Sequence, residues 1–294
     1  MSYSIGIDLG GTNIKAVAIS DEGEVLAQSN APTYGEDGAA VAENVARQMA
    51  ALEAEAGRAA STVGLAAPGM VARDGRSMAS ISGHLEIIEG LDWADYLRGR
   101  EPALLNDAHA ALLGEVWRGA AAGARDAVLL TLGTGVGGAI LSEGRLLRGR
   151  LGRAGHLGHM CLDVDAARDS LGIPGTLEEA IGNRTLPARS AGRFDSTERL
   201  VAAHLAGDAE AARVWLRSVF HLACAVTNII NAIDPEVVII GGGVARAGRA
   251  LFDPLAEYLD TMEWRPQGQS VRIVPASLGD LAGALGAARN AVAA

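Results

Sequence analysis

Apolar and polar positions at the start of the chain follow the pattern of a hairpin with a glycine turn. The string from Ile5 to Lys15 is IGIDLGGTNIK, and it continues through AVAIS and DEGEV, which predicts three strands joined by tight turns. The same pattern returns at Val128 to Glu143, where the string is VLLTLGTGVGGAILSE. Two related hairpins about 120 residues apart predict two similar domains. In this comparison Asp8 corresponds to Thr131.

Between and after the hairpins, strands alternate with helices, which is typical of the α/β class. Apolar residues spaced three and four positions apart predict a helix over Gly38 to Arg58. Two further helices are predicted over Asp195 to Ala206 and Asp208 to Ile233, each with an Asp at the capping position. Short buried strands are expected at residues 62–67, 103–105, 237–240 and 271–275.

The first glycine turn has the residues expected of a phosphate site. Gly10 and Gly11 let backbone N–H groups approach an anion without a Cβ in the way. A carboxylate at Asp8 would repel a bare phosphate, but it suits a divalent cation, typically Mg²⁺, held between carboxylate and phosphate. Thr12 and Lys15 follow, and Lys15 either neutralises phosphate charge or is a solvated lysine at a strand end. A hairpin with a buried capping Asp gives the same pattern.

Two more glycine turns are candidate nucleotide sites. Gly133, Thr134 and Gly135 lie in a GxGxxG string, yet a strand follows the last glycine where a dinucleotide fingerprint requires a helix. This turn is therefore expected to hold phosphate, with Thr134 offering its hydroxyl and N–H group. The other turn follows a buried strand and precedes a helix, so that it can lie against an adenine or ribose. It consists of Gly241, Gly242 and Gly243.

Asp107 is the candidate for catalysis. The string EPALLNDAHAALLGE predicts a short strand that ends at Asn106-Asp107 and runs into a helix. A side chain at Asp107 can cap that helix. It can also act as a general base that takes the proton of a weakly nucleophilic hydroxyl. The paired glycine hairpins favour the second role, and Asn106 would then hold a neighbouring hydroxyl.

Composition sets broad limits on function. The chain has 294 residues, 49% of them apolar, a formal charge of −10 and two distant cysteines, Cys161 and Cys224. The charge disfavours a nucleic-acid partner, and the cysteines are typical of a reducing cytosol without a disulfide framework. No secretory signal or uninterrupted membrane span is apparent. We therefore expect a cytoplasmic protein that binds a small molecule, and neither nucleic acid nor a membrane.

The chain resembles the ROK family of sugar kinases and related proteins in four strings that occur in order: DLGGTNIK, LLNDAHAALLGE, LTLGTGVGGAI and DPEVVIIGGGV. The resemblance runs from residue 5 to about residue 288. It implies two ribonuclease-H-like α/β domains, of the actin/hexokinase ATPase type, around a hinged cleft. The N-terminal domain would span 1–107, completed by a C-terminal helix at about 281–294, and the C-terminal domain would span 108–280.

The resemblance also implies an activity and roles for residues. The activity is ATP-dependent phosphorylation of a hydroxyl on a hexose or hexose derivative, with ATP and Mg²⁺, by a homodimer. Asp107 would be the general base and Asp8 would position Mg²⁺ through water. The residues expected at ATP and its phosphates are Asp8, Gly10, Gly11, Thr12, Lys15, Gly133, Thr134, Gly135, Gly241, Gly242 and Gly243. Those expected at the sugar are Gly69, His84, Asn106, Asp107, His156, His159 and Glu178.

One stretch departs from the family. Relatives usually carry Glu-x-Gly-His, whose His also ligates zinc, followed by a cysteine cluster. Here His156 replaces the Glu in the string HLGHM, and the three cysteines are missing. We therefore predict that the structural zinc site is absent. A different metal site built from His156, His159, Cys161 and Asp163 is a weak alternative.

The change to His156 also bears on the sugar. A carboxylate accepts hydrogen bonds from two hydroxyls, whereas a neutral imidazole offers one acceptor and one donor. The pocket is therefore expected to prefer a hydroxyl pattern other than that of glucose, or a substituted sugar. This hypothesis fails if glucose proves to be clearly the best substrate.

Three alternatives accompany the kinase interpretation. A sugar-responsive repressor is disfavoured, because regulatory members carry a helix-turn-helix ahead of the first hairpin, whereas four residues precede Ile5 here. A catalytically idle sugar-binding or sensor protein is disfavoured because Asp8, Asp107 and both phosphate turns are present. A kinase that uses polyphosphate as its donor is compatible with the sequence.

Overall fold

The computed structural model describes residues 2–81 and 84–293, with the backbone alone for His84. Its contacts divide the chain into two compact units, which are described separately. Unit 1 comprises Met1–Gly123, Leu146–Ala154 and Ser277–Ala294. Unit 2 comprises Ala124–Arg145 and Gly155–Ala276.

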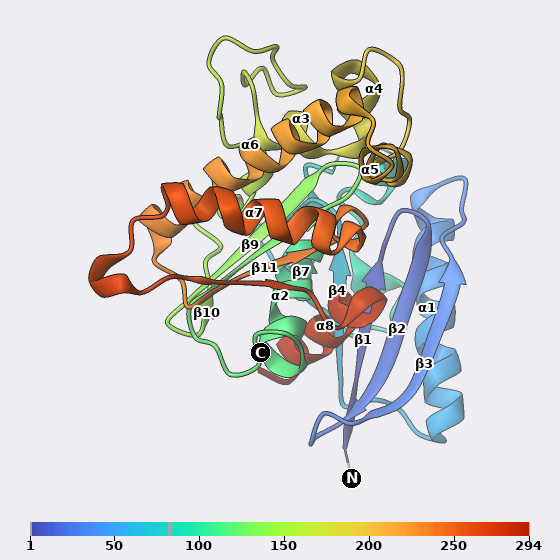
Figure 1. Ribbon diagram of the computed structural model, residues 1–294. Helices are drawn as coiled ribbons and strands as arrows, with labels where there is room; N and C mark the ends of the chain where they lie inside the picture. Colours follow the sequence, from blue (N-terminus) through green and yellow to red (C-terminus); the bar gives the residue numbers. More distant parts are fainter. Residues whose placement is uncertain (1, 82–83, 294) are drawn as a thin grey trace. The chain divides into compact units, whose positions relative to one another are not determined.

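This division differs from the predicted domains in the placement of α2 (Asp107–Arg118). Residues 108–123, 146–154 and 277–280 were predicted in the second domain, whereas the contacts group them with unit 1, and the largest of these segments contains α2. The physical reason is that α2 lies along α8 (Ala282–Ala293), which comes from the end of the chain (Figure 1). The two helices pack closely, because a Cβ added at Gly286 would lie 1.7 Å from the carbonyl oxygen of Ala110.

Unit 1 contains a five-stranded sheet in the order β3-β2-β1-β4-β7. The strands are β1 (Tyr3–Leu9), β2 (Asn13–Ser20), β3 (Val25–Pro32), β4 (Thr62–Ala67) and β7 (Ala103–Asn106). The pairs β1–β2 and β2–β3 are antiparallel, whereas β1–β4 and β4–β7 are parallel. A short antiparallel ladder follows β4 in the chain and joins β5 (Met70–Val71) to β6 (Met78–Ala79).

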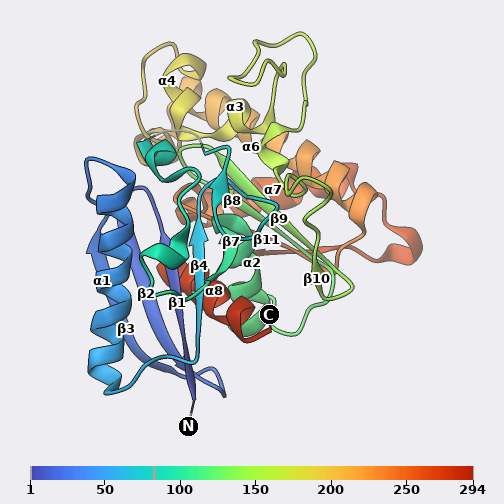
Figure 2. The ribbon, with the colours of Figure 1, turned by 180° about the vertical axis from the view of Figure 1, so that it is seen from behind.

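Helices cover both faces of this sheet. α1 (Gly38–Ala56) packs against β1, β2 and β3 (Figure 2), and its Val41 and Val45 share a core with Ile5 and Ile7. α8 packs on β1, β2 and β4 through small side chains. Residues that alternate along a strand point to opposite faces, so that Ile5 and Ile7 meet α1 while Gly6 meets α8.

Unit 2 repeats this strand order with a second set of strands, β10-β9-β8-β11-β12. They are β8 (Ala127–Leu132), β9 (Val136–Ser142), β10 (Arg145–Leu146), β11 (Val237–Gly241) and β12 (Arg272–Pro275). The β8–β9 hairpin is antiparallel, and β8–β11 and β11–β12 are parallel. Asp8 is the penultimate residue of β1 and Thr131 that of β8, as the comparison of the two hairpins predicted.

The helices of unit 2 surround one large core. They are α3 (Leu177–Ile181), α4 (Leu186–Arg189), α5 (Thr197–Leu205), α6 (Ala209–Ile233) and α7 (Arg249–Met262). α6 packs against α3, α5 and α7, and buries Trp215, Val219 and Leu222. By length and composition alone, α6 is the one helix in the described part of the chain that could span a membrane. Its packing is that of a core helix.

Most predicted elements are present, and two of the helix caps differ from the prediction. β4 covers 62–67 as predicted, and Asp208 caps α6. Ser196, not Asp195, caps α5, because its hydroxyl accepts the Arg199 N–H group. Asn106, not Asp107, caps α2, which leaves Asp107 as the first residue of the helix.

Candidate active site

The turn between β1 and β2 is held in shape by backbone hydrogen bonds. The Gly10 N–H group donates to the Asn13 carbonyl at 3.0 Å, and the Thr33 N–H group donates to the Thr12 carbonyl at 2.8 Å. The Thr33 hydroxyl also donates to the Gly10 carbonyl at 2.7 Å. Thr12 itself is exposed. Thr33 was not expected at this turn from the sequence, because the contact of Thr33 with the turn depends on the pairing of β2 with β3.

Asp8 presents a carboxylate that lacks partners in the described part of the chain. Its oxygens make no hydrogen bond and no ion pair within 4 Å there. The pKa of Asp8 is raised to about 7, mainly by burial; Asp107 and Asp280 contribute to the rise, and Lys15 opposes it. A part of the side chain is nevertheless accessible. Such a carboxylate is costly to ionise unless a cation joins it.

Gly283 makes room for Asp8 and was not expected from the sequence. A Cβ at Gly283 would lie 2.5 Å from an Asp8 carboxylate oxygen, so any larger residue would push the carboxylate aside. Gly283 belongs to the first turn of α8. The positive end of the helix dipole therefore lies beside Asp8 and partly offsets the effect of burial.

Lys15 has a carboxylate partner within unit 1. Its Nζ lies 3.6 Å from the Asp280 carboxylate, and the pair lines a shallow hollow with Gln28 and Asn30. Lys15 contributes to the field at Asp8, whose pKa it lowers. Its contact with ATP phosphate stays a prediction.

Asp107 stands exposed at the start of α2, and Asn106 holds the backbone around it. The Asn106 side-chain oxygen accepts from the N–H groups of Ala108 at 3.0 Å and His109 at 3.3 Å. Its amide nitrogen donates to the Gly69 carbonyl at 2.9 Å. The Asp107 carboxylate accepts from the Ala108 N–H group at 2.9 Å. The structure therefore brings together Gly69, Asn106 and Asp107, with Asp8 close enough to Asp107 for the charges to interact.

The turn between β8 and β9 has a different construction. The Val136 N–H group donates to Glu178 Oε2 at 2.9 Å, and a Cβ at Gly135 would lie 2.2 Å from that oxygen. The Arg184 N–H group donates to the Thr134 carbonyl at 3.0 Å. The N–H groups of Thr134 and Gly135 make no hydrogen bond with a described residue. Both are available to an anion.

Glu178 already has partners within unit 2. One carboxylate oxygen accepts from Val136, and the other accepts from the Arg184 guanidinium at 2.6 Å. A sugar hydroxyl bound by Glu178, as predicted, would have to share the carboxylate with Val136 and Arg184. Arg184 was not singled out in the sequence, because its contact with Glu178 joins α3 to the 3-10 helix Asn183–Thr185 and has no periodic signal.

The remaining glycines lie at the end of β11. Gly242 has φ +85°, and a Cβ there would lie 2.3 Å from the Leu132 carbonyl oxygen, so this position requires glycine. Gly243 is exposed with nothing near its Cβ position. A short 3-10 helix, Val244–Ala247, follows before α7 begins.

Of the two histidines of the variant motif, His156 precedes a 3-10 helix, Leu157–His159, and His159 is its last residue. His159 Nδ1 lies 3.3 Å from an Asp169 carboxylate oxygen, and Cys161 is exposed. Among the described residues, no group of three His, Cys, Asp or Glu side chains is placed to hold a metal. The side chain of His84 lies outside the described part of the structure, so its predicted sugar contact stays a prediction.

Two α/β units with the same strand order, and an exposed Asp at a strand-to-helix junction, define the two-domain fold of actin/hexokinase-type ATPases. The chain belongs to the ROK family, whose profile matches residues 4–293. It is a carbohydrate kinase of that family.

Three relatives support this assignment. The glucokinase of Thermotoga maritima is 35% identical over 97% of this chain and 95% of its own length. The ROK hexokinase structure from Thermus thermophilus has a TM-score of 0.85 and 33% identity, and covers 99% of this chain and 98% of its own. A ROK family glucokinase from Streptomyces griseus, in complex with glucose and AMPPNP, has a TM-score of 0.79 and 26% identity over 100% of both chains.

Proposed function

We propose that the protein transfers the terminal phosphoryl group of ATP to a hydroxyl of a hexose or hexose derivative, with Asp107 as general base. The observation that carries this proposal is the pair of carboxylates in unit 1. Asp107 is exposed at the start of α2, and Asp8 lies near it without a bonded partner among the described residues.

The position of Asp107 suits a base. Its place in the first turn of α2 favours the anionic form, because the positive end of the helix dipole stabilises a negative charge. Asn106 fixes the backbone through three hydrogen bonds, so the carboxylate is held without being buried. A sugar hydroxyl within hydrogen-bond reach would give its proton to Asp107 as the bond to phosphorus forms.

Asp8 fits a role in holding Mg²⁺. Its oxygens are hard donors, and it lacks a counter-charge within 4 Å in the described part of the chain. Mg²⁺ is commonly bound by one or two carboxylates together with substrate phosphates. When bound, the ion would neutralise charge on the phosphates. Asp8 would orient the ion through water, and Gly283 would keep the space for it.

The donor would contact the glycine turns. In unit 1, Gly10 and Gly11 offer a turn without side chains, and in unit 2 the N–H groups of Thr134 and Gly135 are available. Gly242 and Gly243 would lie against the adenosine. The AMPPNP bound by the Streptomyces griseus relative supports ATP as the donor. Polyphosphate is the second candidate donor, and a direct comparison decides between them.

The sugar is where this chain departs from its relatives. His156 replaces the carboxylate usual in the family. The proposed contacts with the sugar are Gly69, His84, Asn106, Asp107, His156, His159 and Glu178. We infer a preference for a hydroxyl pattern other than that of glucose, or for a substituted sugar.

The family and the formal charge of −10 support a homodimer in the cytoplasm that binds neither nucleic acid nor a membrane. Light scattering on the purified protein would test the dimer.

The deciding experiment is Mg·ATP-dependent ADP release with a panel of hexoses, ketoses and N-acetylated amino sugars. Asp107→Asn is measured beside the wild type, and Asp195→Asn, an exposed Asp paired only with Arg199, serves as matched control. We expect one sugar to drive release, a loss of about 10²–10⁴-fold in kcat for Asp107→Asn, and no change for Asp195→Asn. Release that survives Asp107→Asn would refute the assignment of the base.

Two further arms separate the alternatives. Polyphosphate in place of ATP tests the donor. If no sugar supports turnover while ATP still binds, the sensor interpretation replaces the kinase. A clear optimum with glucose would overturn the inference from His156 while leaving the kinase in place.

A further inference from the structure

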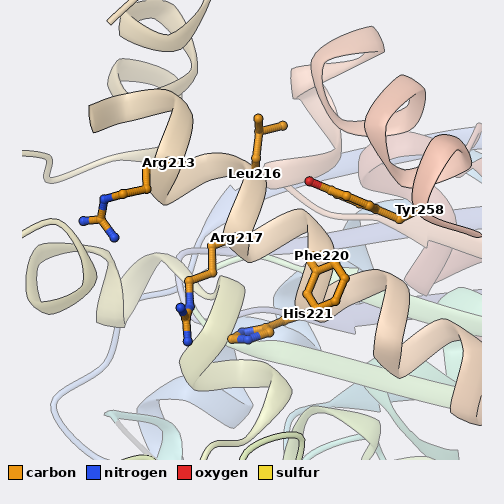
Figure 3. A pocket seen from close by; sticks show the side chains of 6 residues that line it. All are labelled: Arg213, Leu216, Arg217, Phe220, His221 and Tyr258. Atoms are coloured by element: carbon orange, nitrogen blue, oxygen red, sulfur yellow. The ribbon is translucent and has the colours of Figure 1, made fainter. Parts of the chain in front are cut away.

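One face of α6 carries a row of cationic and titratable side chains that no part of the proposed reaction uses. Arg213, Arg217 and His221 recur every four residues, and therefore lie on the same side of the helix. Figure 3 shows the Arg217 guanidinium and the His221 ring close together below Arg213. Two adjoining hollows, of about 460 Å³ and about 410 Å³, share these three residues.

The second hollow also contains a guanidinium without a carboxylate partner. Arg189 of α4 is half-buried, and its N–H groups donate to Thr185 Oγ1, to Ser218 Oγ at 2.6 Å and to the Gly182 carbonyl at 2.7 Å. All three acceptors are neutral, and no described carboxylate lies within 4 Å of the Arg189 side chain. Burial lowers its pKa to about 10. A guanidinium has five N–H groups, so two remain for a ligand.

Positive charge exceeds negative charge around the hollow. Arg217 makes no hydrogen bond or ion pair with a described residue, whereas Arg213 is paired with Glu210. The two acids that line the hollow are Glu179, which is bonded to Arg184 at 3.2 Å, and Asp163. Like charges four residues apart destabilise a helix. An anion between the guanidinium groups would remove that repulsion and supply the missing counter-charge.

The dimensions and walls of the hollow indicate the size of the anion. Small-molecule sites have volumes of about 300–1,000 Å³, and this hollow, at about 410 Å³, lies within that range. A part of its wall is aliphatic, from Val214, Ala166, Ala180 and Ala188. The planar fork of an arginine pairs with two oxygens of a phosphate at once, and a spherical anion such as chloride offers no such pair.

We propose that the hollow between α4 and α6 binds a phosphate group between Arg189, Arg217 and His221. The source is either inorganic phosphate or the phosphate of a small monoester, whose carbon skeleton would lie against the aliphatic wall. Every residue of the site belongs to unit 2 and none is assigned to catalysis. The proposal therefore stands or falls independently of the kinase assignment.

The test is histidine NMR on the full chain, titrated with sodium phosphate at constant ionic strength maintained with sodium chloride. The chain has six histidines, and His221→Gln identifies the His221 ring signal. In the free protein, burial holds the pKa of His221 below its usual value, with Arg217 and Arg189 lowering it further and Asp163 raising it. Bound phosphate should therefore shift the His221 signal to saturation and raise its pKa.

Two variants and a second probe complete the design. Arg217→Gln should weaken phosphate binding about tenfold, the loss expected for one charged hydrogen bond. Arg249→Gln, an exposed arginine on α7 paired with Asp253, is the matched control and should bind as the wild type. Glucose 6-phosphate is the monoester probe. Tighter binding of glucose 6-phosphate identifies a monoester as the ligand, whereas equal binding identifies free phosphate.

Three outcomes would overturn the proposal. The first is a His221 signal that responds to chloride as it does to phosphate. The second is an Arg217→Gln variant that binds phosphate as tightly as the wild type. The third is a titration in which only the other histidine signals move. Because Arg217 makes no bond with a described residue, its replacement should leave the fold intact, and a change in the far-ultraviolet circular dichroism would identify a variant that does not fold.

Discussion

Units 1 and 2 share a strand order, but α8 in unit 1 and α6 in unit 2 pack in different ways. In unit 1, α8 lies so close to the sheet that a Cβ at Gly64 would come within 1.9 Å of the Ala287 carbonyl oxygen. In unit 2, α6 lies over a core of large side chains that includes Trp215 and Leu222. Small residues allow backbones to approach, and large ones keep them apart.

The difference has a chemical consequence. The close approach of α8 brings Gly283 beside Asp8, which leaves the carboxylate in a recess without bonded partners among the described residues. At the corresponding position in unit 2 stands Thr131, and the nearby carboxylate of Glu178 is already bonded to Val136 and Arg184. Unit 1 therefore offers a negative charge to a cation, whereas unit 2 offers N–H groups to an anion.

Among the effects that compare the two units, the largest is expected from substitutions at the two corresponding positions, Asp8 and Thr131. Asp8→Asn should lower kcat/KM for Mg·ATP roughly a hundredfold, because a bound metal ion supplies several kcal/mol of transition-state stabilisation. Thr131→Val, which keeps the shape of the side chain, should change it less than about threefold. The measurement is coupled ADP release over a range of Mg²⁺ concentrations. Equal losses in both variants would contradict the asymmetry.

The second prediction concerns the packing of α8 in unit 1 and of α6 in unit 2. Gly64→Ala forces a Cβ against the α8 backbone and should destabilise the protein by about 3 kcal/mol. Leu222→Ala leaves a cavity under α6 and should cost about the same. The two variants should differ in activity, because Gly64→Ala displaces the helix that makes room for Asp8. Chemical denaturation gives the stability, and turnover by folded protein at low temperature gives the activity. Full activity in Gly64→Ala would contradict the prediction that the position of α8 determines the space for Asp8.

The third prediction is a pH dependence of stability that comes from Asp8 in unit 1. The pKa of Asp8 is about 7 in the folded protein and about 3.9 in an unfolded chain, so the unfolded state loses its proton first as the pH rises. Stability is therefore unaffected below pH 4, falls between pH 4 and pH 7, and stays lower above that range. Because Asp8 is partly accessible, we expect a loss of about 2 kcal/mol.

The Asp8→Asn variant lacks this titration. Its free energy of unfolding, compared with that of the wild type, should therefore rise from pH 4 to pH 8. Denaturation without metal or nucleotide at several pH values measures the difference. Thr131→Val should show no such trend. A constant difference between Asp8→Asn and the wild type across this range would mean that Asp8 ionises as easily in the folded protein as in the unfolded chain.

Local pattern was enough to predict the hairpins, most of the helices and the place of Asp107 between a strand and a helix. The alternation of apolar residues and the position of glycines are properties of neighbouring residues, and they determine strands and turns directly. The role of Gly283 was not predictable, because 275 residues separate it from Asp8 and only the packing of α8 brings them together. The Glu178–Val136 bond was missed for the same reason. For Asn106-Asp107 the sequence was ambiguous, because either side chain can cap a helix.

The smallest expected effect is a difference in stability loss between substitutions at two helix caps, one from each unit. Asn106 is buried and also bonds the Gly69 carbonyl, so Asn106→Ala should cost about 2 kcal/mol, at the upper end of the range for caps. Ser196 caps α5 with a single, long bond of 3.3 Å to the Arg199 N–H group, so Ser196→Ala should cost about 0.5 kcal/mol. Denaturation curves would show the ranking. If the two substitutions cost the same, the Asn106–Gly69 bond adds nothing to the cap, and Asn106 can instead give its amide to a sugar hydroxyl.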